Sequence, residues 1–371
     1  MEQRKRLVYI ASYIDFSYGL EWMAGGIDKN KYEVDFIFLN PKVPEIYHRL
    51  KKNNVNTVFY NYNGKKDLLK VFLKLLFYFL KHRPEIIHAH LFDASLTSLP
   101  AAWLARVKKR IHTRHHGSIH HDSHQQAVKY DRFINYLSTD IIAVSERVKS
   151  ILIDKDKADS RKIVVLHHGF DFSMTEVNFD AVIAMKQKYD LESSYPVIGV
   201  ISRFVEWKGV QFIIPAFKKL LHDYPDAKLV LANANGDYKT SLLKMLADIP
   251  QESYLLVNFE KEVYTLFKCF DFFIHVPVSP EAEAFGQIYI EALACKIPMI
   301  CTVSGIATEF IRDHENAVVV DYANTDDIYK KLKLVMIDEK LKKHIIEEGF
   351  KSVIDAFGMK KMILKLEAAY G

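Results

Sequence analysis

Short apolar runs alternate along the whole chain with longer segments of helical periodicity. The runs are rich in valine, isoleucine and phenylalanine, as expected of strands that are buried on both faces. The intervening segments, such as 210–222 and 327–350, repeat apolar residues every three or four positions, which predicts amphipathic helices. The predicted strands form two series, first 7–11, 34–39, 57–60, 86–90, 110–113, 141–144 and 163–166, then 197–201, 228–232, 254–257, 272–276, 299–301 and 317–320.

Two series of strands that alternate with helices predict an α/β protein with two doubly wound, Rossmann-like domains. The length of 371 residues is sufficient for two domains, each with its own core. We place the first domain at 1–175 and the second at 190–351. Ligands of open parallel sheets bind beyond the carboxyl ends of the strands, so we expect the functional site in a central cleft between the two domains.

Composition narrows the class of protein. A hydrophobic fraction of 49% and a charged fraction of 26% are typical of a soluble globular enzyme. A net charge of +5 does not indicate a nucleic-acid partner, and no GxGxxG motif follows a predicted strand, which disfavours hydride transfer. Three cysteines lie in apolar runs without CxxC spacing, and the first apolar run is too short for a signal peptide. We therefore expect a cytoplasmic location.

Residues 68–80, LLKVFLKLLFYFL, are the most apolar segment, but two lysines interrupt it and it is too short for a membrane span. A basic, apolar helix of this kind can lie on a membrane surface. A helix packed on a sheet, with its lysines reaching past the rim, is the interpretation that we favour. Nearby cations still support the hypothesis of peripheral membrane association with a lipid-linked acceptor, and they are Lys51, Lys52, Lys65, Lys66, Lys81 and Arg83.

The segment 281–302, EAEAFGQIYIEALACKIPMICT, follows a predicted strand and opens a helix near Gly286. The free N–H groups and the positive dipole end of a first helical turn favour a phosphate. Glu283 precedes this helix and Glu291 lies within it. A carboxylate in either place can accept hydrogen bonds from two neighbouring sugar hydroxyls. The alternative is that both are ordinary acidic residues of a helix end.

The segment 202–209, SRFVEWKG, connects the first strand of the second series to the next helix. Arg203 and Lys208 therefore lie at the carboxyl edge of the sheet. Two cations there, opposite a helix N-terminus, can neutralise a diphosphate without a metal ion. A nucleotide diphosphate that leaves a sugar needs this neutralisation, because its negative charge grows as the bond breaks. The alternative is a surface salt bridge with Glu206.

Together, SRxxxxKG at 202–209 and ExFGxxxxEAxAxxxPxI at 283–300 resemble the family-four glycosyltransferases of the GT-B fold. Further similarities follow in the family's order along nearly the whole chain. They are IIHAH at 86–90, HG at 116–117, IIAVSE at 141–146, HGFD at 168–171 and SGIATE at 304–309.

The resemblance implies roles for the donor-binding residues. Arg203 and Lys208 would hold the donor phosphates, and Glu283 would contact hydroxyls of the donor sugar. Glu291 would hold the ribose hydroxyls. The backbone near the sugar and the diphosphate would come from Phe285, Gly286 and Gln287.

The resemblance also implies the reaction and the remaining positions. His116 would face the reacting centre, Gly19 would belong to a glycine loop over the phosphates, and the helix 352–371 would pack on the first domain. The reaction would be transfer of a sugar, with retention and without a metal or cofactor, from a nucleotide diphosphate to a glycan or lipid-linked saccharide. We favour a UDP-sugar over a GDP-sugar. The alternatives are a GT-B sugar-nucleotide epimerase and a non-catalytic nucleotide-sugar binding protein.

A dense histidine cluster follows the fifth predicted strand in the sequence IHTRHHGSIHHDSH. Imidazoles with a carboxylate, here Asp122, can bind zinc or another divalent ion. Their spacing matches no standard metal site, so we expect a polar acceptor loop and no metal. The cluster consists of His112, His115, His116, His120, His121 and His124.

Overall fold

A computed structural model describes residues 4–371 of the protein. The chain divides into two compact units. The first domain contains residues 4–170 and Met359–Gly371, and the second is Asp171–Gly358. The first unit thus ends five residues before the boundary expected at 175. The segment that returns to it begins at Met359 rather than at 352, because residues 352–357 continue a helix of the second domain.

The first domain is built on a parallel sheet of seven strands, in the order β3-β2-β1-β4-β5-β6-β7. Each strand coincides with one that the apolar runs predict. Their bounds are β1 (Lys5–Ser12), β2 (Tyr32–Asn40), β3 (Asn56–Asn61), β4 (Ile86–His90), β5 (Lys109–Arg114), β6 (Asp140–Ala143) and β7 (Ile163–Val165).

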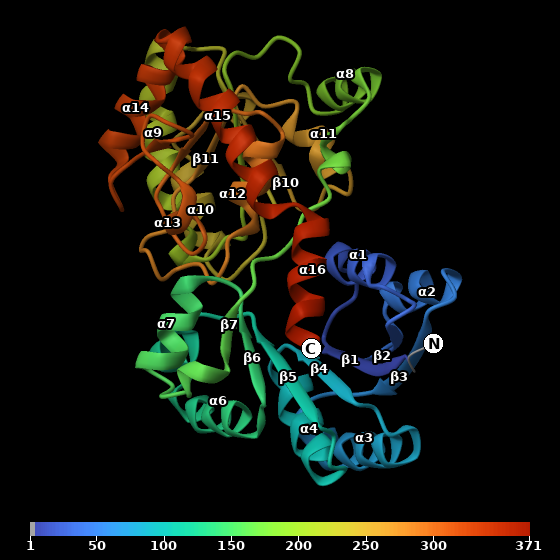
Figure 1. Ribbon diagram of the computed structural model, residues 1–371. Helices are drawn as coiled ribbons and strands as arrows, with labels where there is room; N and C mark the ends of the chain where they lie inside the picture. Colours follow the sequence, from blue (N-terminus) through green and yellow to red (C-terminus); the bar gives the residue numbers. More distant parts are fainter. Residues whose placement is uncertain (1–3) are drawn as a thin grey trace. The chain divides into compact units, whose positions relative to one another are not determined.

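Helices cover both faces of this sheet (Figure 1). Successive residues of β1 point to opposite faces of the sheet, and both faces are apolar. Leu7 and Tyr9 belong to one apolar core, and Val8 and Ile10 belong to the other. The first core includes α1 (Tyr18–Gly26), α2 (Glu45–Lys52) and α16 (Met359–Tyr370). The second includes α3 (Leu68–His82), α4 (Phe92–Leu104) and α6 (Gln125–Leu137). Two shorter helices complete the domain, α5 (Ile119–Ser123) and α7 (Glu146–Asp154).

The second domain has a parallel sheet of six strands, in the order β10-β9-β8-β11-β12-β13. These strands also lie where the sequence predicts them. Their bounds are β8 (Val197–Ile201), β9 (Lys228–Ala232), β10 (Tyr254–Val257), β11 (Phe272–His275), β12 (Met299–Cys301) and β13 (Val318–Val319).

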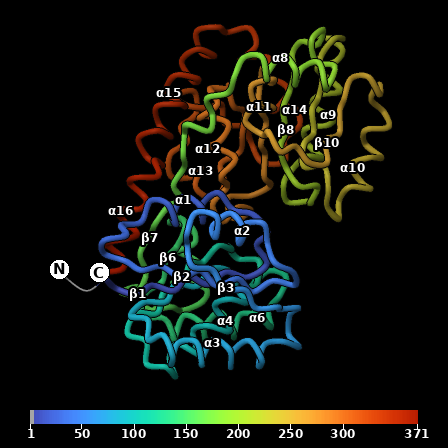
Figure 2. Tube along the Cα trace, turned by 90° about the vertical axis from the view of Figure 1, so that its right-hand side faces the viewer, coloured from blue at the N-terminus to red at the C-terminus, as the bar shows by residue number. Residues whose placement is uncertain are grey.

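The helices of the second domain form two groups around this sheet. Figure 2 shows α9 (Val210–Asp223), α10 (Lys239–Leu246) and α14 (Thr325–Ile337) on one side, where they share a core with β8 and β9. On the other side α12 (Gln287–Ala294) packs against α15 (Glu339–Phe357). The remaining helices are α8 (Phe179–Lys188), α11 (Val263–Phe267) and α13 (Ala307–Phe310).

The single helix predicted over 327–350 is wrong. Two helices occupy this region, and Asp338 lies between them. The carboxylate of Asp338 accepts hydrogen bonds from the N–H groups of Lys340 and Leu341, so it starts a new helix. The apolar period continues across the break, which is why periodicity alone does not reveal it.

Candidate functional site

The strand order of the second domain reverses between β8 and β11, which are neighbours in the sheet. The connection after β8 leads to β9 on one side, and the connection after β11 leads to β12 on the other. The two loops therefore separate at the carboxyl edge, which is where open α/β sheets bind ligands. Arg203 and Lys208 lie in the first loop, and Glu283 lies in the second.

Lys208 and Glu283 form the centre of this site. The Nζ atom of Lys208 lies 2.5 Å from Oε1 of Glu283, and Nε2 of His275 lies 3.1 Å from the same oxygen. The backbone N–H of Glu283 donates to Oγ of Ser304, at 2.9 Å, from the loop after β12. The loops after β8, β11 and β12 thus meet at Glu283, which is almost fully buried.

The charges at this centre follow from the contacts. Burial raises the pKa of Glu283, but the hydrogen bond from His275 and the charge of Lys208 outweigh it, so the pKa falls to about 2. Burial lowers the pKa of His275, and its contact with Glu283 only partly offsets this. At neutral pH the site therefore holds an ionised glutamate and a neutral histidine that donates to it.

Two glycines permit the loops to approach. Gly209 has φ +76°, and a β-carbon there would lie 1.8 Å from the carbonyl oxygen of Val276, at the end of β11. Gly305 has φ +57°, and its β-carbon would lie 2.8 Å from Cβ of Glu283. Both the left-handed conformation and the space require glycine at these positions. The glycine after Lys208 is thus what lets its loop pass beside β11.

The helix α12 begins directly behind Glu283. Gly286 precedes it with φ +83°. The N–H groups of Gln287 and Ile288 come before the first turn is closed, so they have no partner within the helix. These N–H groups and the helix dipole favour an anion. The ring of Phe285 packs edge-on against Phe357 within the second domain, which fixes the residue between Glu283 and the helix start.

Glu291 lies one turn further along α12. Its Oε1 atom accepts hydrogen bonds from the hydroxyl of Tyr264, at 3.4 Å, and from Nε2 of Gln287, at 3.2 Å. Burial raises the pKa of Glu291 to about 7, because these two contacts offset the burial only in part. Its carboxyl group consequently changes charge near neutral pH.

Arg203 and Gly19 are the two remaining residues that the sequence predicts for the donor site. The side chain of Arg203 is exposed in the loop after β8, whereas the next residue, Phe204, is buried in the core. Gly19 lies in the first turn of α1 rather than in the preceding loop. A β-carbon at Gly19 would have only Oγ of Ser17 within 4 Å, at 3.8 Å, so packing does not require glycine there.

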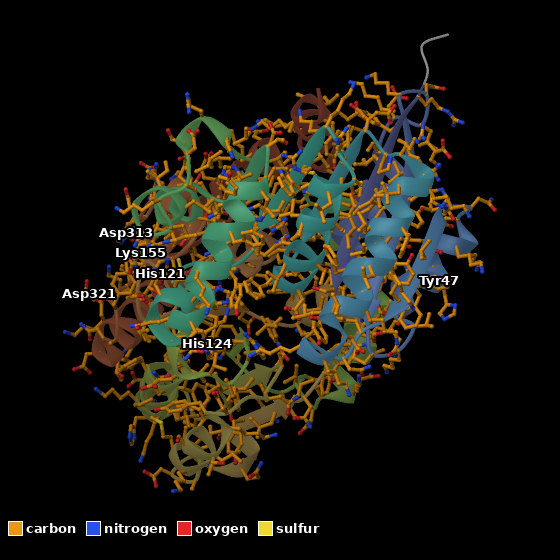
Figure 3. All side chains as sticks on the ribbon, turned by 90° about the horizontal axis from the view of Figure 1, so that it is seen from below. Tyr47, His121, His124, Lys155, Asp313 and Asp321 are labelled. Carbon is orange, nitrogen blue, oxygen red and sulfur yellow. The ribbon has the colours of Figure 1, made fainter. Side chains whose placement is uncertain are left out.

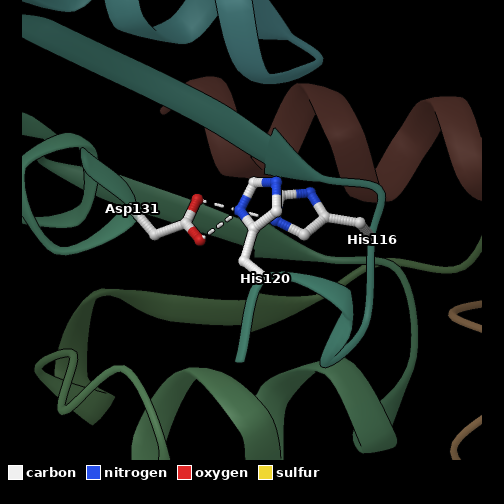
Figure 4. Close-up of side chains that lie close together, drawn as sticks. All are labelled: His116, His120 and Asp131. Atoms are coloured by element: carbon white, nitrogen blue, oxygen red, sulfur yellow. Dashed lines mark hydrogen bonds and ion pairs between the residues drawn. The ribbon is translucent and has the colours of Figure 1, made fainter. Parts of the chain in front are cut away.

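In the first domain, His116 belongs to a cluster around a buried carboxylate (Figure 4). Nδ1 of His120 lies 2.6 Å from Oδ2 of Asp131, and Nε2 of His116 lies 3.5 Å from Oδ1. Oδ1 of Asp131 is also 2.8 Å from Nη1 of Arg114. Burial lowers the pKa of His116, and its contact with Asp131 raises it only partly, so this ring is neutral at neutral pH.

A second carboxylate extends the cluster. Asp156 pairs with Nη2 of Arg114 at 3.2 Å and with Nε2 of His121 at 2.6 Å. Arg114 and both carboxylates, Asp131 and Asp156, are buried. One buried arginine between two buried carboxylates makes this a structural ion-pair cluster that anchors the histidines.

The prediction of one polar loop is only partly confirmed, because His115 and His116 lie in a loop after β5 whereas residues 119–123 form the helix α5. The sequence pattern indicated Asp122 as the carboxylate that contacts the histidines. In the structure Asp122 instead accepts a hydrogen bond from Ser118 and pairs with Lys155. Figure 3 labels Lys155, His121 and His124 at this edge of the domain. His116, His120 and Asp131 each offer one ligand atom, and these atoms lie within 4.8 Å of one another, so within residues 4–371 these three side chains could together hold a metal ion.

Pattern analysis missed several residues of both sites. His275 could have been found, since it is a polar residue at the last position of an otherwise apolar strand. Ser304 stands in the SGIATE segment at 304–309, but that segment does not indicate the contact with Glu283. The carboxylates of Asp131 and Asp156 stand in no motif and are far in sequence from Arg114, with which they pair. Only the strand order and the helix positions bring them to the sites.

Comparisons with known families match the two domains separately. The family described as "Glycosyltransferase Family 4" matches residues 22–173, and the family described as "Glycosyl transferases group 1" matches residues 182–352. The capsular polysaccharide biosynthesis glycosyltransferase CapM of Staphylococcus aureus is 27% identical over 322 residues, which cover 81% of this chain and 80% of CapM.

Two further similarities extend the comparison. A Campylobacter jejuni enzyme named N-acetylgalactosamine-N,N'-diacetylbacillosaminyl-diphospho-undecaprenol 4-alpha-N-acetylgalactosaminyltransferase is 27% identical over 195 residues, 52% of this chain and 49% of that protein. The crystal structure of Anabaena Alr3699/HepE in complex with UDP and glucose has a TM-score of 0.85 at 16% identity and covers 99% of both chains, which shows a shared fold. The chain belongs to the family-four glycosyltransferases of the GT-B fold, and it is a glycosyltransferase.

Proposed function

We propose that this glycosyltransferase moves a sugar from a UDP-sugar to a saccharide acceptor, with retention of the anomeric configuration and without a metal ion. The observation that carries this proposal is the contact between Lys208 and Glu283 at the point where the strand order reverses. A cation and an ionised carboxylate are held side by side there. One suits a phosphate and the other suits sugar hydroxyls.

The donor phosphates would be held by three positive groups. Lys208, the exposed Arg203 and the N-terminus of α12 all lie beyond the carboxyl ends of neighbouring strands. As the bond between sugar and phosphate breaks, negative charge grows on the leaving diphosphate, and these groups stabilise it. A cationic site of this kind supplies the neutralisation that a divalent metal gives in other transferases, which supports activity without a metal.

Two carboxylates would hold the sugars on either side of the diphosphate. Glu283 is ionised and fixed by His275 and Ser304, so its free lone pairs are directed by the protein before the donor binds. Glu291, one turn into α12, would accept the two ribose hydroxyls of the nucleotide. The backbone of Phe285, Gly286 and Gln287 would line the path between them.

His116 would act as a catalytic residue that contacts the donor sugar at the reacting centre. Its ring is neutral and is held against Asp131 at the carboxyl edge of the first sheet. A neutral imidazole can donate a hydrogen bond to a sugar hydroxyl without adding positive charge beside a developing oxocarbenium ion. Retention would follow from attack on the same face that the diphosphate leaves, with the leaving phosphate oxygen accepting the acceptor proton.

The acceptor would be a glycan or a lipid-linked saccharide of polysaccharide biosynthesis. The relatives support this class, since one is named for capsular polysaccharide biosynthesis and another for a diphospho-undecaprenol acceptor. The three cysteines are buried and unpaired, in keeping with work in the cytoplasm, on the inner face of the membrane.

Thermal shift with nucleotide diphosphates tests the donor proposal. UDP should raise the melting temperature of the protein more than GDP or ADP does, and this rise should persist in EDTA. A larger rise with GDP would move the donor to a GDP-sugar. Proton NMR of the product tests retention, because the coupling constant of the new anomeric proton should match that of the donor sugar. An inverted product would contradict the proposed stereochemistry.

A further inference from the structure

The helix α3 has two apolar faces. Val71, Leu75 and Phe79 are buried against the sheet. Leu69, Leu73, Phe77 and Leu80 are on the opposite side and are 70%, 41%, 67% and 50% exposed. The two sets are offset by two residues, which is about 200° around a helix. One face explains the packing of the helix, and the other has no role in the core.

The neighbouring helix extends the exposed apolar face. α4 packs against α3 and ends with Trp103 and Leu104, which are 54% and 50% exposed. Both helices lie lowest in Figure 1, and Figure 3 is seen from their side. We name the exposed side chains of the two helices the α3–α4 face, which consists of Leu69, Leu73, Phe77, Leu80, Trp103 and Leu104.

Cations border the α3–α4 face. Lys70, Lys74 and Lys81 are exposed along one side of the apolar row, and within residues 4–371 none of the three forms an ion pair. At one end a groove of about 320 Å³ separates α3 from the end of α4. Leu80 lines this groove together with three cations and one carboxylate. The cations are Arg83, Arg106 and Lys108, and the carboxylate is Glu85. An apolar row beside unpaired cations is complementary to a surface that has an apolar interior and an anionic outer layer.

We propose that the α3–α4 face docks on a bilayer that contains anionic lipids, with the apolar row in the boundary of the acyl chains and the lysines at the phosphates. The face combines the two contributions that stable peripheral binding needs, buried apolar area and basic charge. Trp103 suits the same boundary, because tryptophan prefers the membrane interface. This inference deepens, and rests on, the proposed use of a membrane-bound acceptor.

The length and charge of the helix disfavour other occupants. α3 has 15 residues and is about 22 Å long, shorter than the ~30 Å hydrocarbon core, so it lies on a membrane rather than across it. Within residues 4–371 no helix is long and apolar enough to span a bilayer. In a symmetric dimer the same patch of each copy would meet, which would bring the unpaired lysines of both together.

Vesicle flotation of the full chain tests the proposal. The protein should float with vesicles of phosphatidylcholine and phosphatidylglycerol at low salt, and less with pure phosphatidylcholine or at high salt. Leu69→Gln and Phe77→Gln should each lower the partition coefficient by about tenfold. Lys70→Gln, Lys74→Gln and Lys81→Gln should lower it by about fivefold each.

Matched controls separate this effect from general loss of surface apolarity or charge. Phe259→Gln and Ile337→Gln change side chains that are 80% and 70% exposed in the second domain and should leave flotation unchanged. Lys340→Gln, Lys343→Gln and Lys351→Gln provide the same control for charge. All of these variants should keep the wild-type melting temperature, since the changed side chains are exposed.

Three results would overturn the proposal. The first is wild-type protein that does not float with anionic vesicles at low salt. The second is equal loss of flotation in the control variants. The third is a dimer that Phe77→Gln converts to a monomer in sedimentation, which would assign the face to a second copy. Hydrolysis of the UDP-sugar without vesicles should be equal in Phe77→Gln and wild type, so failure of docking and failure of the donor site can be told apart.

Discussion

Lys208 and Glu283 meet at 2.5 Å across two loops whose strands are neighbours but whose connections leave the sheet in opposite directions. The pair is in place before any donor is bound, together with His275 on the same carboxylate oxygen. A site that is organised in this way pays little reorganisation energy during the reaction. The close contact also means that a change at Lys208 raises the pKa of Glu283, which the charge of the lysine helps to lower.

Removing either partner should strongly reduce turnover. We expect Lys208→Ala and Glu283→Gln each to lower kcat by about 10²–10³-fold, because each acts on charge that develops in the transition state. The double variant should be no slower than the slower single variant, since both residues belong to one unit. The measurement is initial-rate kinetics of UDP release.

The exposed ion pair between Lys218 and Asp248, at 3.1 Å, provides the matched control for this prediction. Lys218→Ala and Asp248→Asn should leave kcat within twofold of wild type, about the effect of a surface pair. Near-normal turnover in Lys208→Ala or Glu283→Gln would remove both residues from the donor site.

Gly209→Ala should destabilise the second domain and disturb the site. The added β-carbon would lie 1.8 Å from the carbonyl oxygen of Val276, and the backbone has φ +76°. The left-handed conformation and the shift of two loops should cost more than about 2 kcal/mol. Urea unfolding measures this cost. Gly25→Ala is the control, because no atom lies within 4 Å of its β-carbon and the residue is helical, so stability should stay equal or rise.

Glu291 should make stability depend on pH in a direction that its raised pKa fixes. The pKa is about 7 in the folded protein against 4.5 for the free side chain, so the folded state keeps a proton that the unfolded state has lost. Stability therefore falls as pH rises from 4.5 to about 7, by at most about 3 kcal/mol. Glu291→Gln removes this cost at pH 8 and changes little at pH 5.

Two measurements check the prediction for Glu291. Urea unfolding at pH 5 and pH 8 should show Glu291→Gln more stable than wild type only at the higher pH, and an equal difference at both would contradict the raised pKa. KM for the UDP-sugar should fall from pH 6 to pH 8 in the wild type, because the ionised carboxylate is the form that accepts both ribose hydroxyls. The same pH dependence in Glu291→Gln would count against the ribose role.

Asp131 should be essential to the first domain. Burial raises the pKa of Asp131, but the hydrogen bonds with His116 and His120 and the charge of Arg114 lower it well below its usual 3.8. Its contribution to stability is therefore present above pH 3.8 and is lost as the pH falls below that value. Asp131→Ala should cost about 3–5 kcal/mol at pH 7, since it breaks a buried ion pair.

Unfolding in urea checks the prediction for Asp131. Asp122→Asn is the matched control, because Asp122 lies in the preceding helix α5 and its side chain is 57% exposed. We expect the control to differ from wild type by less than about 0.5 kcal/mol. Equal stability of Asp131→Ala and wild type would show that the cluster around Arg114 does not hold the domain together.

The order of strands and helices could be predicted from the sequence because both signals are local. β8 and β11 are continuous apolar runs, and α9 repeats its apolar residues with the helical period. The break at Asp338 is an exception, since a side chain that caps a helix leaves the apolar period unchanged. Capping depends on a hydrogen bond rather than on burial.

The residues of the donor site could be predicted from their motifs, but the contacts between residues of different motifs could not. Lys208 and Glu283 belong to separate motifs, and their contact depends on the order of β8 and β11 in the sheet, which the local pattern does not contain. Asp131 is an acidic residue in the middle of a helical segment and has no pattern of its own. Its role follows from the neighbouring Arg114, which the first sheet positions.

Release of UDP from a panel of UDP-sugars, measured in EDTA with wild type and Glu283→Gln, tests the central claim most directly. The wild type should release UDP from at least one sugar donor in the chelator, and Glu283→Gln should do so at least about 100-fold more slowly. Melting curves should show both proteins folded at the assay temperature, because the glutamine keeps the shape of the side chain even though it removes the ion pair with Lys208 and lowers the melting temperature. Absence of UDP release by the wild type, or equal rates in the two proteins, would contradict the account.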